Sequence, residues 1–292
     1  MITTQTNHSV AFPPRIYLDA PIIQRSDDIL RCEPAEVVDM ALGKLQRAGI
    51  VLLEWHSLLY HRMNVPVLIK ARTCISMLVP IAISRISLQD YSYAVPDEQL
   101  DEASVLLSSM GLPLSPPTTL LLTTEGDFQA KARFHRITPW TSPSFVQHLA
   151  LYPQSFSTLD DSELEEKPPH HSTTSSLCKS IRVPSRPAVY ASIIRLLLSY
   201  PQYCATTTVL QSDLSELIGY DLLGLEDGYL DPYDEETIVA IGLEQRLANA
   251  TQVVMQWGID GVWRPGEEWI GDALGAVVAG TGSIEHLPCK ES

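Results

Sequence analysis

The sequence contains little that would direct the chain to a membrane or to an oxidising compartment. Residues 1–10 are polar and lack the cationic start and apolar stretch of a secretory signal. The most apolar window, residues 65–84, contains two prolines and two basic residues, which makes it a poor membrane span. The five cysteines are widely spaced and form no Cys-x-x-Cys pair, so we expect reduced thiols. We therefore expect a soluble, cytoplasmic protein without membrane attachment.

Basic residues are also scarce. Lys and Arg number 20 against 35 Asp and Glu, which gives a formal net charge of −15. Binding to a phosphate backbone needs clustered cations, so this acidic chain is not expected to bind nucleic acid, and a protein partner is the better expectation. Hydrophobic residues make up 45% of the 292 residues, which is enough to bury a sizeable core.

Several short catalytic motifs are missing. The chain has no phosphate-binding Gly-x-x-x-x-Gly-Lys-Ser/Thr, no dinucleotide-binding Gly-x-Gly-x-x-Gly, no Gly-x-Ser-x-Gly and no His-Glu-x-x-His. The usual support for a simple nucleotide hydrolase, a dinucleotide enzyme, an α/β-hydrolase or a zinc protease is therefore absent.

Composition and turn residues divide the chain into five parts. We expect a flexible lead over 1–15, an α/β core over 16–152, and a linker or disordered loop over 153–180, which is rich in Ser, Thr, Pro and acids. A helical region over 181–270 and a flexible tail over 271–292 complete the chain. His170 and His171 fall in the expected linker, where we expect them to be solvated.

Hydrophobic periodicity places the main elements. In the core we expect helices over 36–48, 55–62 and 97–111, and strands over 50–53, 85–95, 118–123, 130–137 and 145–152. In the C-terminal part we expect helices over 188–200, 213–223 and 234–250. The predicted class is therefore α/β, a small mixed sheet flanked by helices with a helical C-terminal region.

Five short segments resemble a known group of proteins. They are residues 48–52 (Ala-Gly-Ile-Val-Leu), 55–60 (Trp-His-Ser-Leu-Leu-Tyr), 64–66 (Asn-Val-Pro), 90–100 (Asp-Tyr-Ser-Tyr-Ala-Val-Pro-Asp-Glu-Gln-Leu) and 106–112. In this order they resemble a family of uncharacterised fungal proteins with a nucleotidyltransferase-like fold. That resemblance also implies an insertion over 70–89, which is either a true loop or a gene-model artefact such as a retained intron.

The resemblance implies where a catalytic site would lie. Active members of the superfold open a short helix with a glycine-containing turn that lets backbone amides approach phosphate. Here His56 and Ser57 stand at that turn, and they are the implied nucleotide-binding residues. A histidine side chain does not permit the close backbone approach that glycine gives.

The same resemblance implies a set of metal ligands. Active members place two acids at positions i and i+2 of a strand, with a third acid further along the chain, to bind divalent metal on the triphosphate. Asp90 matches the first position and is the implied metal ligand, but Ser92 occupies the second. Asp90 and Ser92 are thus the catalytic candidates, and Glu125 or Asp127 is the candidate third acid. We expect His56, Ser57, Asp90 and Ser92 to lie in one concave region.

These departures shape the functional hypothesis. One carboxylate beside neutral hydroxyls should bind magnesium weakly, so we expect a catalytically degenerate pseudoenzyme that acts as a binding or scaffold protein. The alternative is a metal-dependent nucleotidyl transferase that uses Mg²⁺ and a nucleoside triphosphate on an unknown acceptor. An enzyme of another chemistry that uses the same cleft is a third class.

Overall fold

A computed structural model of the chain describes residues 29–66, 68–69, 87–88, 90–142, 145–170, 177–225 and 242–291. The predicted lead over 1–15, nearly all of the 70–89 segment and the predicted helix start at Asp234 lie outside these residues. His171 lies outside them as well.

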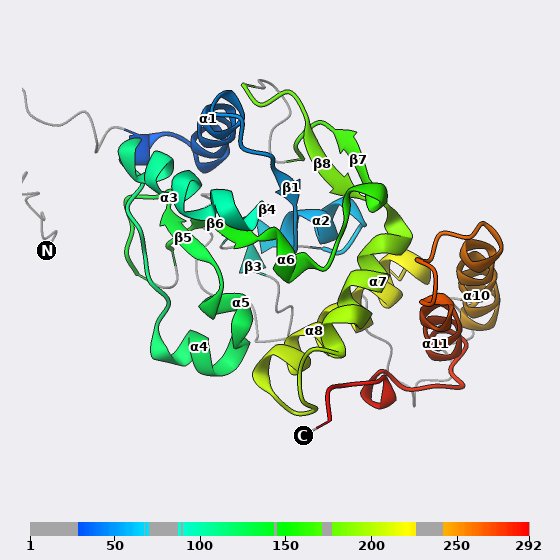
Figure 1. Cartoon of the computed structure of the whole chain (residues 1–292). Helices are drawn as coiled ribbons and strands as arrows, with labels where there is room; N and C mark the ends of the chain where they lie inside the picture. Colours follow the sequence, from blue (N-terminus) through cyan, green and yellow to red (C-terminus); the bar gives the residue numbers. More distant parts are fainter. Residues whose placement is uncertain are drawn as a thin grey trace, which may run out of the picture.

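Six strands form one open mixed sheet in the order β5-β6-β4-β1-β8-β7 (Figure 1). β4 runs parallel to β6 and antiparallel to β1, and β1 runs parallel to β8. The edge strands β5 and β7 are antiparallel to their neighbours. The bounds are β1 Leu53–Glu54, β4 Asp90–Val95, β5 Arg133–Arg136, β6 His148–Pro153, β7 Leu164–Lys167 and β8 Ile181–Pro184; β2 Leu68–Ile69 and β3 Ser87–Leu88 pair separately.

The central strands are buried along most of their length. β4 is buried from Tyr91 to Val95, and β6 is buried from Leu149 to Tyr152. A strand that is covered on both faces needs apolar or small side chains throughout, which explains the near-continuous apolar runs in both segments.

Helices cover the sheet on its faces and at its ends (Figure 1). α1 packs on α3, α3 packs on β5 and β6, and α2 packs on β4. α4 and α5 lie against α8, which follows α7. The bounds are α1 Pro34–Arg47, α2 Ser57–Arg62, α3 Leu100–Ser109, α4 Thr119–Glu125, α5 Asp127–Ala130, α6 Gln154–Ser157, α7 Arg186–Leu197 and α8 Ala205–Leu217, with a π-helical turn at Ile218–Leu222.

The two last helices form a pair at one side of the molecule. α10 (Leu243–Ile259) packs on α11 (Glu268–Val278), and α11 contacts α7 (Figure 1). Short 3₁₀ segments complete the described chain at Ile29–Arg31, Asp97–Gln99, Asp161–Glu163 and Ile284–His286. Within the described residues, no helix has both the length and the apolar character needed to cross a membrane.

The predicted α/β class with a mixed sheet flanked by helices is confirmed, although the sheet has six strands. The predicted strand over 118–123 was wrong, because these residues form α4. Thr118 accepts a hydrogen bond from the Leu121 backbone N–H and so caps the helix, and α4 packs on α8. The run of leucines gave no periodicity that separates a strand from a short helix.

The predicted linker over 153–180 also differs from the structure. Residues 153–167 contain the end of β6, α6, a capped 3₁₀ turn and the edge strand β7, which pairs with β8. Some of the acids that suggested a solvated linker instead form hydrogen bonds within the folded protein. Asp160 and Glu163 form a capping box, and Glu163 is buried.

The C-terminal predictions need two corrections. β8 lies inside the sheet, although the sequence assigned residues 181–184 to a helical region. The predicted flexible tail over 271–292 is folded as far as residue 291, since α11 extends to Val278 and buries Ile270 and Leu274. The Lys290 backbone N–H donates to the carbonyl of Tyr200, which fixes the end of the described chain.

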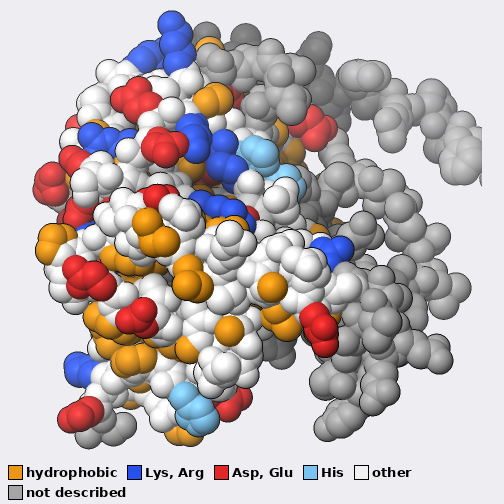
Figure 2. Space-filling model, turned by 90° about the vertical axis from the view of Figure 1, so that its right-hand side faces the viewer, with side chains coloured by type: hydrophobic (Ala, Val, Ile, Leu, Met, Phe, Trp, Pro, Cys, Tyr) orange, Lys and Arg blue, Asp and Glu red, His pale blue; other side chains and the backbone are white. Residues whose placement is uncertain are grey.

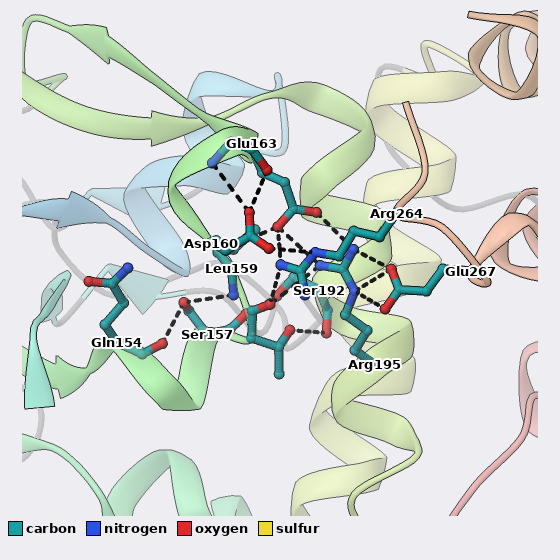
Figure 3. A network of polar contacts seen from close by, with 11 residues as sticks. Gln154, Ser157, Leu159, Asp160, Glu163, Ser192, Arg195, Arg264 and Glu267 are labelled. Atoms are coloured by element: carbon teal, nitrogen blue, oxygen red, sulfur yellow. Dashed lines mark hydrogen bonds and ion pairs between the residues drawn. The ribbon is translucent and has the colours of Figure 1, made fainter. Parts of the chain in front are cut away.

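A buried ion network joins the sheet to the C-terminal helices (Figure 3). Arg195 on α7 donates to both carboxylate oxygens of Glu163, at 2.8 and 3.2 Å, and to Glu267 at 2.6 Å. Arg264 contacts Glu163 as well and lies 2.9 Å from Asp160. The side chains of Arg195 and Glu163 are each 8% exposed, so each charge depends on the other for the interactions that water would otherwise provide.

Glu163→Gln should therefore lower the free energy of unfolding by about 3 kcal/mol, because it leaves two arginines without part of their counter-charge in a buried setting. Glu166→Gln, at an exposed position of β7 three residues further on, is the matched control and should change stability by less than about 0.5 kcal/mol. Urea unfolding of the three proteins measures both effects. Equal stability of the Glu163 and Glu166 variants would contradict the structural importance of the network.

Candidate functional site

The predicted site residues gather where β1 ends and where β4 and β6 begin. β1 is antiparallel to β4, and β6 is parallel to β4 with Asp90 opposite His148. The C-terminal end of β1 therefore lies at the same edge as the first residues of β4 and β6. The chain leaves β1 at Glu54 and enters α2 at Ser57, so the turn between them lies at this edge.

Asp90 is engaged on two sides. Its carboxylate Oδ1 lies 2.7 Å from Nδ1 of His148, and its side chain is 28% exposed. The Ser57 hydroxyl donates to the Asp90 backbone carbonyl at 2.8 Å. The start of α2 and the start of β4 are thus joined directly.

His56 occupies a backbone conformation that normally belongs to glycine. Its φ and ψ are 55° and −124°, and Gly126 has nearly the same pair at 58° and −127°. This conformation is that of the first central residue of a type II′ turn, where a Cβ is crowded. The fold accepts backbone strain of about 1–3 kcal/mol to place a histidine side chain here.

The His56 side chain lies among aromatic rings and an aspartate. Its ring centroid is 5.3 Å from that of Tyr60 and 5.0 Å from that of Phe128. Nε2 is 3.4 Å from Asp213 Oδ2, an ion-pair distance at which the two atoms do not meet hydrogen-bond geometry. Tyr60 donates its hydroxyl hydrogen to the same Asp213 oxygen at 3.1 Å.

The surrounding carboxylates change the acidity of this cluster. Burial lowers the pKa of His56, but Asp213, with Glu125 and Asp90, outweighs it and raises the pKa above its usual value. Burial, with a contribution from Asp213, raises the pKa of Glu216 to about 7, while His56 opposes the shift. His56 is therefore favoured as a cation among acids, and Glu216 is poised to titrate near neutral pH.

Of the four residues that we expected in one concave region, three lie close together and Ser92 is buried in β4. Ser57 contacts Asp90, and His56 is close enough to Asp90 for that charge to affect its pKa. Ser92 lies inside β4 and is only 1% exposed, while its carbonyl accepts from the Trp55 N–H at 3.2 Å. Its hydroxyl therefore does not face an open cleft, contrary to the concave arrangement that the sequence suggested.

The two candidate third acids are also separated. Glu125 is close enough to raise the pKa of His56, and it accepts a hydrogen bond from Gln129 at 2.6 Å. Asp127 instead accepts from the Tyr200 hydroxyl at 2.7 Å and lies 3.3 Å from Lys131 Nζ. Of the two, Glu125 is the acid that belongs with His56.

Sequence reasoning missed His148, Asp213 and Glu216. Asp213 was read as the start of a helix over 213–223, whereas α8 begins at Ala205 after the capping residue Cys204 and places Asp213 within its last two turns. His56 and Asp213 are far apart in the chain, and no local spacing links them. The signal lies only in the packing of α8 beside α2.

A surface hollow of about 540 Å³ lies at the opposite end of β4. Asp97, Glu98, Asp161 and Arg182 contribute to its lining. Asp97 accepts hydrogen bonds from the backbone and hydroxyl of Ser155, and Arg182 contacts Asp161. The hollow is therefore separate from the His56 cluster.

Comparison of the chain with known protein families, with curated proteins and with solved structures finds no match. The chemistry of the site therefore has to follow from the contacts of His56 with Asp213, Tyr60 and Phe128.

A pair of substitutions at His56 isolates the backbone strain. His56→Ala and His56→Gly both remove the imidazole, but only glycine relieves the φ of 55°. We expect the glycine variant to be more stable than the alanine variant by about 1 kcal/mol, because strain relief exceeds the entropic cost of glycine in the unfolded chain. Thermal or urea unfolding measures the difference. An alanine variant of equal or greater stability would show that His56 is unstrained.

Stability should also depend on pH through Glu216. Its folded pKa of about 7 is above the ordinary 4.5, so between these values the folded state retains a proton that the unfolded state releases. Stability from this group is present at low pH and is lost as the pH rises through 7.

Glu216→Gln cannot ionise, so we expect it to exceed the natural protein in stability by about 1 kcal/mol near pH 8, with solvent screening allowed for, and to match it near pH 5. Glu244→Gln, at an exposed position on α10, is the control. Unfolding measured across this pH range checks the effect. Parallel pH profiles for the natural protein and the Glu216 variant would contradict the raised pKa.

Proposed function

We propose that this chain is a nucleotidyltransferase-like protein that is catalytically degenerate and acts as a binding or scaffold protein. The observation that supports this most strongly is the state of its acid positions. Asp90 is paired with His148, and the position two residues later is a buried serine in place of a second carboxylate. Neighbouring acids supply most of the charge that binds a divalent cation, so this pair is a weak magnesium site.

The turn before α2 supports the same proposal. A phosphate group needs close access to backbone amides at such a turn. Here the residue with the glycine conformation is His56, whose side chain lies against Tyr60 and Phe128 and near Asp213. The turn keeps the geometry that glycine would give but adds a side chain that phosphate would have to avoid.

A protein is the partner class that the surface favours. The chain has a net charge of −15, which disfavours nucleic acid. Met255 and Ile259 on α10 are 63% and 77% exposed, and the face in Figure 2 mixes apolar side chains with acidic and basic ones. The proposal includes a soluble protein in the cytoplasm, as the sequence predicts.

One observation favours the alternative, a metal-dependent nucleotidyl transferase that acts on an unknown acceptor. Ser57, Asp90 and Glu125 come to the same end of the sheet, around His56. Under this alternative, Asp90 and Glu125 would bind Mg²⁺, and the nucleoside triphosphate would lie against the start of α2.

An assay of pyrophosphate release separates the two proposals. The natural protein, incubated with Mg²⁺ and each nucleoside triphosphate, should release no more pyrophosphate than Asp90→Asn, because a single paired carboxylate does not assemble the metal site. Unfolding midpoints with and without Mg²⁺ and nucleotide report binding independently. Magnesium-dependent release by the natural protein that disappears in Asp90→Asn, with the fold intact, would replace the first proposal by the alternative.

A further inference from the structure

Two histidines from distant parts of the chain meet at the surface. His61 lies near the end of α2, and His170 follows β7. Nδ1 of His61 and Nε2 of His170 are 2.7 Å apart, and the ring centroids are 4.8 Å apart. His170 is exposed, in line with the expected solvated side chain, but it also contacts His61, and the pair remains accessible to solutes.

The surrounding contacts position His170 over α2. Arg62 donates to the carbonyl of Pro168 at 2.9 Å and makes a two-point ion pair with the buried Glu54, at 2.6 and 2.8 Å. The backbone N–H of His170 donates to Glu54 at 3.4 Å. In addition to the contact between the rings, His170 is therefore held near α2 by contacts of the backbone.

The facing nitrogens have the chemistry of a metal-ligand pair. Neutral imidazole is a common ligand for Zn²⁺, Ni²⁺ and Cu²⁺. With metal–nitrogen distances near 2.0–2.1 Å and a tetrahedral angle, two ligand nitrogens lie about 3.3 Å apart. The rings need to separate by only about 0.6 Å to admit a cation, a small movement for an exposed side chain.

We propose that His61 and His170 form a two-histidine site for a borderline divalent transition-metal cation, with water in the remaining coordination positions. The proposal is independent of the proposed function and does not involve Asp90 or His56. Glu54 and Arg62 act as positioning residues, since they fix His170 through its backbone and through Pro168.

The charged neighbours of His170 act on its pKa in opposite directions. Burial, followed by the charges of Arg62 and His61, lowers the pKa of His170, and Glu54 opposes this shift. The neutral imidazole is the form that coordinates metal. Arg62 repels a bound cation, but its charge is paired with Glu54.

Calorimetric titration of the full chain with NiCl₂ tests the site. Nickel is chosen because it prefers imidazole nitrogen, while thiols such as the exposed Cys32 compete strongly for zinc. The natural protein should bind one Ni²⁺, and His61→Gln should weaken that binding about tenfold or more. His286→Gln, at an exposed histidine of the last 3₁₀ segment, is the matched control and should bind like the natural protein.

His170→Gln is the second variant and should also weaken binding about tenfold or more. Unfolding midpoints without metal show that each variant is folded. Equal nickel affinity in the natural protein and a folded His61→Gln, or no nickel binding by the natural protein, would overturn the proposal and leave a hydrogen-bonded histidine pair.

Discussion

The pairing of Glu163 with Arg195 and Arg264 connects the sheet to the C-terminal helices. Glu163 precedes the edge strand β7, Arg195 lies on α7, and Arg264 lies between α10 and α11. A buried carboxylate without these arginines would be very costly, and so would the arginines without it. The network therefore makes the position of the C-terminal helices depend on the correct course of the chain through residues 153–167, the segment that composition alone presents as a linker.

α1, α2 and α3 were predictable because their signals are local. α1 ends where Gly49 follows the apolar stripe, and α3 follows Pro96 and Asp97 as turn chemistry requires. β4 and β6 could be recognised from apolar runs of strand length. β7 could not, because an exposed edge strand with acidic side chains has the composition of a loop. Its structure comes from backbone pairing with β8 and from the buried Glu163 at its start.

The site shows the same division between local and distant information. We expected His56, Ser57 and Asp90 to lie together, and the Ser57 hydroxyl contacts the Asp90 carbonyl. The residues that set its chemistry could not be found this way. His148 reaches Asp90 through strand pairing, and Asp213 reaches His56 through helix packing. Each contact joins residues that are far apart in the sequence, and no sequence motif links them.

The short helix α2 explains why two different sites can be so close in sequence. At its start, the Ser57 hydroxyl bonds to the first residue of β4, and at its end, Arg62 bonds to the last residue of β1. Both strands belong to the middle of the sheet, so six residues are fixed at both ends. His56 and His61 face different neighbours, α8 for the first and the residues after β7 for the second. Because both ends of α2 are bonded to the sheet, the contacts that His56 makes at the start of the helix do not constrain those that His61 makes near its end.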